Sequence, residues 1–271
     1  YVSVNLADDR ALDGHLLPGI PTGGVPKGLR GTSIPFHYNN IAELEEIVAK
    51  NPDLAVVKME VCRNFGPEDN FLQKVRDLCT KSGIVLIFDE CTSGFRETFG
   101  GLYKKYGVNP DMTIYSKTMA NGYALSAVVG RKDIMEAAQG SWISSTFWTE
   151  RIGPTAALAA LAEMERTKSW EKITAIGLDN KKRWQALADK YGLKINQWGI
   201  PALAGDTFDS PSALAYKTYI TQEMLKQGYL AGNSLYPCLA HTPEILDDYF
   251  EKLDKIFADI RDFEDGRDVM K

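Results

Sequence analysis

The stretch VLIFDECTSGFR, residues 85–96, decides the fold class. Its first four residues, Val85 to Phe88, are all apolar, which is typical of a buried strand in a parallel sheet. The strand ends at two carboxylates, Asp89 and Glu90, for which a buried strand has no structural need. In open α/β sheets, ligands bind beyond the carboxyl ends of the strands. The pattern therefore predicts an α/β fold with a positively charged ligand group near Asp89.

Segments with strand and helix patterns alternate on both sides of this stretch. Residues 10–36, rich in Gly and Pro, predict a long loop. The alternation that follows predicts right-handed βαβ units and a mostly parallel sheet flanked by helices. The expected strands are 54–59, 84–90, 111–117 and 125–130, and the expected helices are 41–50, capped by Asn39 or Asn40, and 70–83, closed by Gly83.

The pattern changes in the C-terminal part of the chain. An Ala-rich helix from about residue 154 is followed by mixed helices and short strands, which predicts a smaller α+β domain. We place the boundary near residue 165, so that 1–165 form a large domain and 166–271 a small one. The expected helices here are 168–191, 211–227 and 243–262, and the expected strands lie around 192–197 and 235–240.

The composition is that of an ordinary globular protein and narrows the classes of function. Of the 271 residues, 44% are hydrophobic and 25% charged, and the net charge of −5 argues against a nucleic-acid-binding or membrane-binding surface. No apolar run approaches the roughly 20 residues of a transmembrane helix. Four scattered cysteines and three histidines indicate neither a disulfide scaffold nor a zinc site. We expect a cytoplasmic protein without a metal.

An apolar strand that ends in Asp-Glu is also typical of the Walker B strand of ATPases. That interpretation requires a phosphate-binding G-x-x-x-x-G-K-[ST] string. No such string occurs in the chain, where GGVPKGLRG, residues 23–31, has glycines and a lysine in another arrangement. An ATPase is therefore disfavoured.

A second interpretation pairs the carboxylate with an amine. Pyridoxal phosphate (PLP) requires an acid at its pyridine nitrogen and a lysine at its aldehyde. Lys117 ends the predicted strand 111–117 and enters a loop that contains Asn and Gly. A lysine is poorly suited to a buried strand end unless it has a partner or forms a covalent bond. The residues alone leave two alternatives: Asp89 and Lys117 hold the cofactor, or Lys117 extends to solvent and Asp89 caps a turn.

The segment LIFDECTSGFRETFGGLYKKYGVNPDMTIYSKTMANGYALSAVVGRKDIM, residues 86–135, resembles the central signature of class III, fold-type-I aminotransferases. The likeness is greatest to the glutamate-1-semialdehyde aminomutase branch. It continues through PFHYNNIAELEEIV, residues 35–48, and QEMLKQGYLAGNSLYPCLAHT, residues 222–242. The resemblance implies a PLP-dependent transferase of fold type I, present here in part.

The resemblance also implies roles for individual residues. Lys117 matches the lysine that forms a Schiff base with PLP and shuttles a proton, and Asp89 matches the acid on the pyridine nitrogen. Cys91 stands where the family usually has Val against the cofactor ring. Glu60 aligns with the Glu of a Glu-Pro turn, but Val61 replaces the proline, so solvation of a strand end is an equal alternative.

The family places a threonine from the neighbouring subunit against the cofactor phosphate, which implies a homodimer with a shared site. Thr149 has the matching spacing from Pro154 and Thr146 the matching local context, and the two stay open as alternatives. Residues 120–124 depart from the family's Gly-rich loop and are expected to shape a different substrate pocket. The family's phosphate-binding turn and its stacking aromatic residue are expected upstream of Tyr1.

The expected activity is amino transfer between a primary amine and a carbonyl acceptor, both small molecules. The alternative within the same chemistry is a 2,1-aminomutase, an isomerase that returns the amine to an adjacent carbon. An alternative of another class is a catalytically silent fragment or oligomerisation module, since the phosphate contacts expected upstream supply much of the cofactor's binding.

Overall fold

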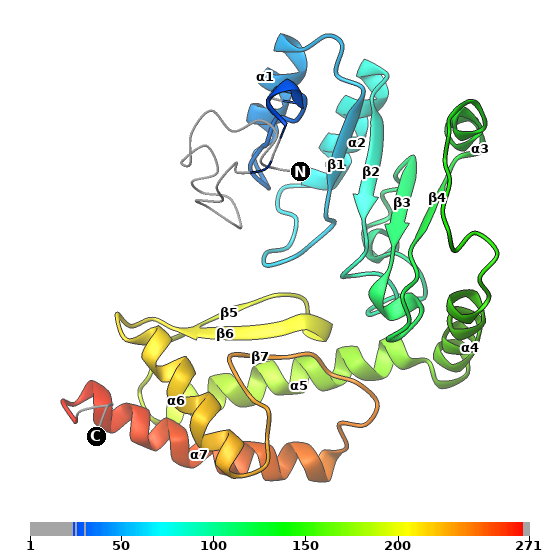
Figure 1. Cartoon of the computed structure of the whole chain (residues 1–271). Coiled ribbons are helices and arrows are strands. Elements are labelled where there is room, and N and C mark those ends of the chain that lie inside the picture. The colour runs from blue at the N-terminus through cyan, green and yellow to red at the C-terminus, as the bar shows by residue number, and fades with distance from the viewer. Residues whose placement is uncertain (1–23, 25, 30, 268–271) are drawn as a thin grey trace. The chain divides into compact units, whose positions relative to one another are not determined.

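The structure, a computed structural model, describes residues 24, 26–29 and 31–267, so most of the predicted loop 10–36 lies outside the described part. The chain forms two compact units (Figure 1). The first contains Tyr1–Lys58 and Pro67–Ile87, and the second contains Met59–Gly66 and Phe88–Lys271. The predicted domain boundary near residue 165 stays a prediction.

The described part of the first unit contains two α-helices, one short 3-10 helix and most of two strands. Helix α1, Ile41–Lys50, begins where Asn40 Oδ1 accepts a hydrogen bond from Glu43 N at 3.2 Å, as the capping pattern predicts. Helix α2, Phe71–Ser82, ends at Gly83 in a left-handed conformation. Strands β1, Val56–Met59, and β2, Val85–Asp89, occupy the predicted positions.

Four strands form the main sheet in the order β1-β2-β3-β4. The sheet is mixed and mostly parallel, and its last two strands, β3, Met112–Tyr115, and β4, Ala127–Gly130, run antiparallel with Met112 opposite Gly130. In β2, Leu86 and Phe88 are fully buried, whereas Val85 and Ile87 are half-buried. The apolar run therefore has one fully buried face among the described residues, rather than the two that its sequence predicts.

The C-terminal part of the second unit packs helices on a small antiparallel sheet. Strands β5, Ile195–Trp198, β6, Ala204–Phe208, and β7, Ser234–Leu235, follow that order, and α5, α6 and α7 lie on one side of them (Figure 1). The helices are α4, Ile152–Thr167, α5, Ser169–Lys190, α6, Ala213–Lys226, and α7, Pro243–Glu264. Helices α5, α6 and α7 share a core that includes the fully buried Trp184, Met224, Phe257 and Ile260.

Strand β6 is a strand of this region that the sequence pattern does not predict. Its segment AGDTF contains Gly and Asp, which are depleted in strands. The glycine is required by packing, because a Cβ at Gly205 would lie 2.2 Å from the Trp198 ring on the paired strand. Tertiary packing therefore overrides the local preference.

Short helical segments complete the described chain: η2, Lys27–Leu29, η3, Leu102–Tyr106, η4, Lys117–Met119, α3, Lys132–Met135, η5, Glu136–Gly140, and η6, Pro201–Leu203. Across the described residues, every helix is too short or too polar to span a bilayer.

Candidate functional site

The loop after β2 is fixed by the two carboxylates at the strand end. The half-buried Asp89 accepts a hydrogen bond from Cys91 N to its Oδ1 at 3.1 Å, which shapes the first turn of the loop. The next residue joins the loop to β3, because Glu90 N donates to Ile114 O at 2.9 Å. The ends of β2 and β3 are therefore held together.

Glu90 has a structural role that separates it from Asp89. Its side chain is fully buried and accepts hydrogen bonds from Ser93 Oγ and, at 3.0 Å, from Tyr103 N. Burial raises the pKa of the Glu90 carboxyl, and the hydrogen bonds oppose that shift. Glu90 is therefore held within the protein interior, and Asp89 is the half-buried carboxylate of the two.

Lys117 lies directly beyond β3, as the first residue of η4. Its backbone is in the left-handed region, with φ of 48°, which a non-glycine residue adopts only at some cost in free energy. Its side chain is exposed, and the amine donates a hydrogen bond from Nζ to Thr92 Oγ1 at 3.2 Å. Thr92 follows Asp89 by three positions, so the amine reaches the loop that the carboxylate begins.

Thr92 is the centre of the site's hydrogen-bond network. Its Oγ1 accepts a second hydrogen bond, from Arg63 Nη1 at 3.0 Å, and its carbonyl accepts one from Arg96 Nε at 2.6 Å. Three cationic side chains, those of Lys117, Arg63 and Arg96, thus converge on one threonine. The region around the Lys117 amine is suited to anionic or electron-rich ligands.

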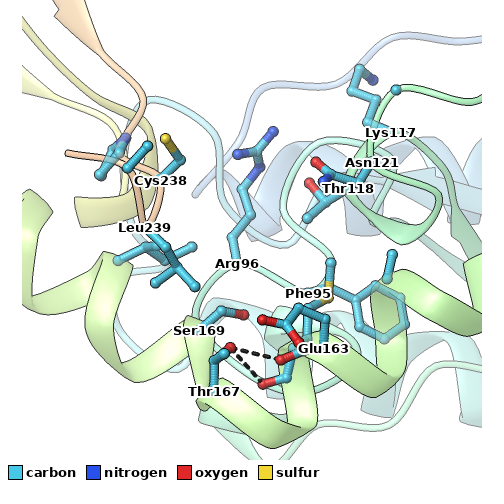
Figure 2. Close-up of a pocket in the computed structure, with 16 residues that line it drawn as sticks. Phe95, Arg96, Lys117, Thr118, Asn121, Glu163, Thr167, Ser169, Cys238 and Leu239 are labelled. Carbon is cyan, nitrogen blue, oxygen red and sulfur yellow. Dashed lines mark hydrogen bonds between the residues drawn. The ribbon is translucent and has the colours of Figure 1, made fainter.

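A cavity of about 540 Å³ opens beside Lys117, within the size range of small-molecule sites (Figure 2). Its walls come from the loop after β2, from η4 and the turn after it, from α4 and α5, and from the loop before α7. The lining residues are Phe95, Arg96, Lys117, Thr118, Asn121, Gly122, Ala160, Glu163, Met164, Thr167, Ser169, Ile173, Pro237, Cys238, Leu239 and Ala240.

Comparison with known proteins identifies the family. Residues 55–257 match the model of the family described as aminotransferase class-III. The chain belongs to the class III aminotransferases. This confirms the resemblance that the Asp89-to-Lys117 signature indicates, and members of this family depend on PLP.

Two curated class III relatives illustrate the range of activities. A 3-aminobutyryl-CoA aminotransferase of Cloacimonas acidaminovorans (strain Evry) is 31% identical over 255 residues, which cover 88% of this chain and 61% of the relative. A glutamate-1-semialdehyde 2,1-aminomutase of Neisseria meningitidis serogroup C / serotype 2a (strain FAM18) is 31% identical over 262 residues, with the same coverage. The chain thus spans about three fifths of the length of these relatives.

Solved structures confirm the expected fold, PLP-dependent transferase fold type I, in part of its extent. The FumI protein of Sphingopyxis sp. MTA144, in its PLP internal aldimine form, matches with a TM-score of 0.83 and 24% identity over 91% of this chain and 62% of that one. A transaminase with PLP bound matches with a TM-score of 0.83 and 22% identity, over 99% of this chain and 66% of that one.

The other predicted site residues differ in how they connect to the hydrogen-bond network around Lys117. Cys91 is half-buried in the turn after Asp89, next to the network. Glu60 is half-buried just after β1, and its Oε1 accepts a hydrogen bond from Arg63 Nη1 at 3.4 Å, so Arg63 links Glu60 to Thr92. Glu60 is therefore joined to the site indirectly.

Thr146 and Thr149 lie on an exposed segment before α4. Neither is among the residues that line the cavity beside Lys117 in the described part of the chain. The contact of either threonine with the cofactor phosphate of a second copy stays a prediction, and the choice between them stays open.

The residues at the strand ends fit PLP in their chemistry. They supply a half-buried carboxylate, an exposed primary amine on a neighbouring strand end, and hydrogen bonds that hold both to one loop. Among the described residues, no group of three or more His, Cys, Asp or Glu side chains is placed to bind a metal ion.

Sequence reasoning missed Thr92, Arg63 and Arg96 as parts of the site. Arg96 belongs to the Gly-Phe-Arg string of the family signature, and that string was the available signal. Thr92 and Arg63 gave no signal, because their residue types are common in surface loops and their contacts join positions 25 and 29 apart in the chain.

Proposed function

We propose that this chain carries the lysine and the acid of a PLP-dependent aminotransferase, which moves an amino group between a primary amine or amino acid and a carbonyl acceptor. One observation carries the proposal. The Lys117 amine donates a hydrogen bond to Thr92, in the loop that Asp89 begins, and Asp89 and Lys117 lie at the ends of the neighbouring strands β2 and β3.

Pyridoxal phosphate, when bound, supplies an electron sink that stabilises negative charge on the carbon next to the substrate nitrogen. Asp89 would accept a hydrogen bond from the protonated pyridine nitrogen and favour its positive charge. The Lys117 Nζ would attach the cofactor's aldehyde and then, once displaced by the substrate amine, hold and return the proton of that carbon. Thr92 would orient the amine for both tasks.

The other predicted site residues would contact the cofactor or support a residue near it. Cys91, beside Asp89, would pack as a small apolar group against one face of the cofactor ring. Glu60 would act through Arg63, which it holds toward Thr92. Thr146 or Thr149 of a second copy would contact the cofactor phosphate, so the functional unit would be a homodimer. A cytoplasmic location remains a prediction from composition and cysteine usage.

A 2,1-aminomutase is the second candidate, and its support comes from the relatives. Several of them are glutamate-1-semialdehyde 2,1-aminomutases, at 31–36% identity. Residues 120–124 border the cavity through Asn121 and Gly122. Their departure from the aminomutase loop pattern favours the transferase over the mutase. Turnover that requires a separate amino acceptor indicates a transferase, and turnover without one indicates a mutase.

The third candidate is a silent fragment or oligomerisation module. The chain spans about three fifths of the length of its curated relatives. A chain with this fold and no cofactor affinity would fulfil that role.

The deciding experiment adds PLP to the chain, records the visible absorbance band of lysine-bound cofactor, reduces the bond with borohydride and maps the labelled peptide. We expect a band and a single pyridoxyl group on Lys117. Lys117→Met should abolish both, whereas Lys74→Met, which removes an exposed lysine of α2, should change neither. No band, or label spread over several lysines, would contradict the proposal and favour the silent module.

A further inference from the structure

The core beneath the sheet of β5, β6 and β7 contains a carboxyl group without a partner. Asp206, in β6, is 4% exposed, and in the described part of the chain no other residue forms a hydrogen bond or an ion pair with its carboxyl. Ala204 and Phe208, on either side of it in the same strand, belong to the core between this sheet and α5, α6 and α7. Because side chains alternate along a strand, Asp206 points into that core. A buried carboxyl without a cation is stable there only in its neutral form.

The groups that face Asp206 from the neighbouring elements are polar but uncharged. Gln197 of β5 lies directly opposite Asp206, and its Nε2 donates a hydrogen bond to Lys181 O of α5 at 2.5 Å. Asn180, the preceding residue of α5, is fully buried, and neither its Oδ1 nor its Nδ2 has a hydrogen-bond partner in the described part of the chain. Burial and the charge of Asp206 raise the pKa of Tyr249 of α7, so Tyr249 faces the carboxyl as a neutral hydroxyl.

The charged groups of the surrounding helices are bound elsewhere. The Lys181 amine donates to Gly199 O at 2.7 Å. Tyr216, which enters the same core from α6, donates from its hydroxyl to Glu264 at 2.6 Å. The packing around Asp206 therefore offers it no compensating charge.

The protonation state of Asp206 consequently changes near neutral pH. Burial raises the pKa of its carboxyl from the ordinary 3.8 to about 7, and its own backbone N–H opposes that shift. The carboxyl of an exposed or unfolded segment ionises near the ordinary value instead. The stabilisation from the buried neutral carboxyl is therefore complete at acidic pH below that value, and it is lost as the pH rises through about 7.

Ionised Asp206 requires water, and the β7 edge of the sheet is the weakest barrier to it. Strand β6 lies in the middle of the sheet, paired with β5 over four residues and with β7 over two. Asp206 N donates to Asn233 O, directly before β7, at 3.0 Å, and Leu235 of β7 packs against the core. Displacing β7 therefore opens the core beside Asp206 and breaks few hydrogen bonds.

Strand β7 leads directly into a wall of the cavity beside Lys117. The strand ends at Leu235, and residues 237–240, here called the wall segment, line the cavity. Figure 2 shows Cys238 and Leu239 of the wall segment across the cavity from Lys117. A displacement of β7 therefore reaches the cavity.

We propose that Asp206 is a proton-controlled switch of this wall. With the carboxyl protonated, β6 retains β7 and the wall segment closes the cavity. Loss of the proton draws water to β6, releases β7 and opens the wall. Asn180 favours the opening, because its unpartnered amide gains hydrogen bonds to water when the interface between α5 and β6 loosens. The switch is a property of the chain without cofactor, and only its effect on amino transfer rests on the proposed function.

Amide hydrogen exchange of residues 230–240 in the cofactor-free chain tests the switch, with rates corrected for the intrinsic effect of pH. We expect the wild-type opening constant to rise about tenfold for each pH unit between about pH 5 and about pH 7 and then to level off, because opening releases one proton in that range. Asp206→Asn keeps the shape without the charge, so its opening constant should not vary with pH. Asp209→Asn, which neutralises an exposed carboxyl beyond the end of β6, should behave as the wild type.

His241 is the other titratable group close to the wall segment, and it acts with the opposite sign. Its Nδ1 accepts a hydrogen bond from Cys238 N at 2.9 Å, which a protonated imidazole cannot do. Protonation of His241 would therefore loosen the wall segment as the pH falls, whereas ionisation of Asp206 loosens it as the pH rises. The direction of the change separates the two groups.

A second measurement needs no variant. In a carboxyl-carbon NMR titration of the wild type, one aspartate should titrate near pH 7, and the amide signals of residues 233–240 should shift over the same range. An opening constant that is independent of pH in the wild type, or that varies equally in Asp206→Asn, would overturn the inference. The same holds if every aspartate titrates below about pH 5.

The outcomes separate this inference from the proposed function. If exchange follows the expected pH dependence and PLP gives no lysine-bound band, the switch stands and the proposed function fails. If the band forms and the opening constant does not vary with pH, the proposed function stands and the switch is overturned.

Discussion

Lys117 combines a reactive amine with an unfavourable backbone conformation, since its φ of 48° lies in the left-handed region. Backbone strain of this kind persists where the surrounding structure imposes it, often at functional sites. We expect Lys117→Gly to be more stable than Lys117→Ala by about 1 kcal/mol, because glycine adopts this φ without a steric cost. Both variants lose the exposed amine, so the difference between their free energies of unfolding reports the backbone alone.

Denaturant unfolding of the two variants measures that difference. The control pair is Lys74→Gly and Lys74→Ala within α2, where the alanine variant should be the more stable by about 1 kcal/mol. If Ala were also preferred over Gly at position 117, the left-handed backbone would not be a property of the folded chain.

Lys117 also shows how much of the site can be predicted from sequence at the scale of single residues. The positions of Asp89 and Lys117 at the ends of apolar strands were predictable, and charged residues there are unusual enough to mark them as candidates. The left-handed conformation of Lys117 and the role of Thr92 were not predictable. They depend on contacts between positions far apart in the chain, and no local pattern encodes these.

At the scale of elements, α5 is held against η6 by a glycine. A Cβ at Gly177 would lie 1.9 Å from the Pro201 carbonyl oxygen, a contact that only backbone movement can relieve. We expect Gly177→Ala to destabilise the fold by about 2 kcal/mol, although alanine favours helix formation by about 1 kcal/mol. The cavity should change as well, because α5 also supplies Ser169 and Ile173 to its wall.

The measurement is the free energy of unfolding from denaturant titration, with Leu178→Ala as the control. Leu178 is the next residue of α5 and is 55% exposed, so its truncation should cost less than Gly177→Ala. A Gly177→Ala variant as stable as the wild type would show that α5 and η6 do not pack this closely.

Most elements were predictable from sequence because their own residues favour them. Helices α1, α2 and α7 have clear periodicity, and Asn40 and Gly83 mark helix ends that the structure confirms. Strand β6 was not predictable from sequence, because its conformation depends on pairing with β5 and on the Trp198 ring over Gly205. Local preference predicts an element well until a partner elsewhere in the chain decides the conformation.

At the scale of the whole molecule, the segment before α4 exposes large apolar side chains to solvent. Trp142 is 96% exposed, Phe147 75% and Trp148 70%, an arrangement that favours burial against another protein surface. The occupant we propose is a second copy of this chain, because Thr146 and Thr149 lie in the same segment and neither lines the cavity of its own chain. The shared site and the exposed aromatic residues then have one explanation.

We therefore expect the chain to sediment as a dimer. Replacing Trp142, Phe147 and Trp148 together by Ser should weaken dimerisation at least about a hundredfold, since buried aromatic residues dominate interface energies. Leu230→Ser, which alters a side chain 95% exposed in another loop, serves as the control. Sedimentation velocity over a range of concentrations measures the association, and PLP titration of the same samples measures the cofactor affinity.

If Thr146 or Thr149 of the partner contacts the cofactor, the triple variant should lose cofactor affinity in proportion to its loss of dimer. A monomeric wild type that binds PLP fully would show instead that each chain completes its own site.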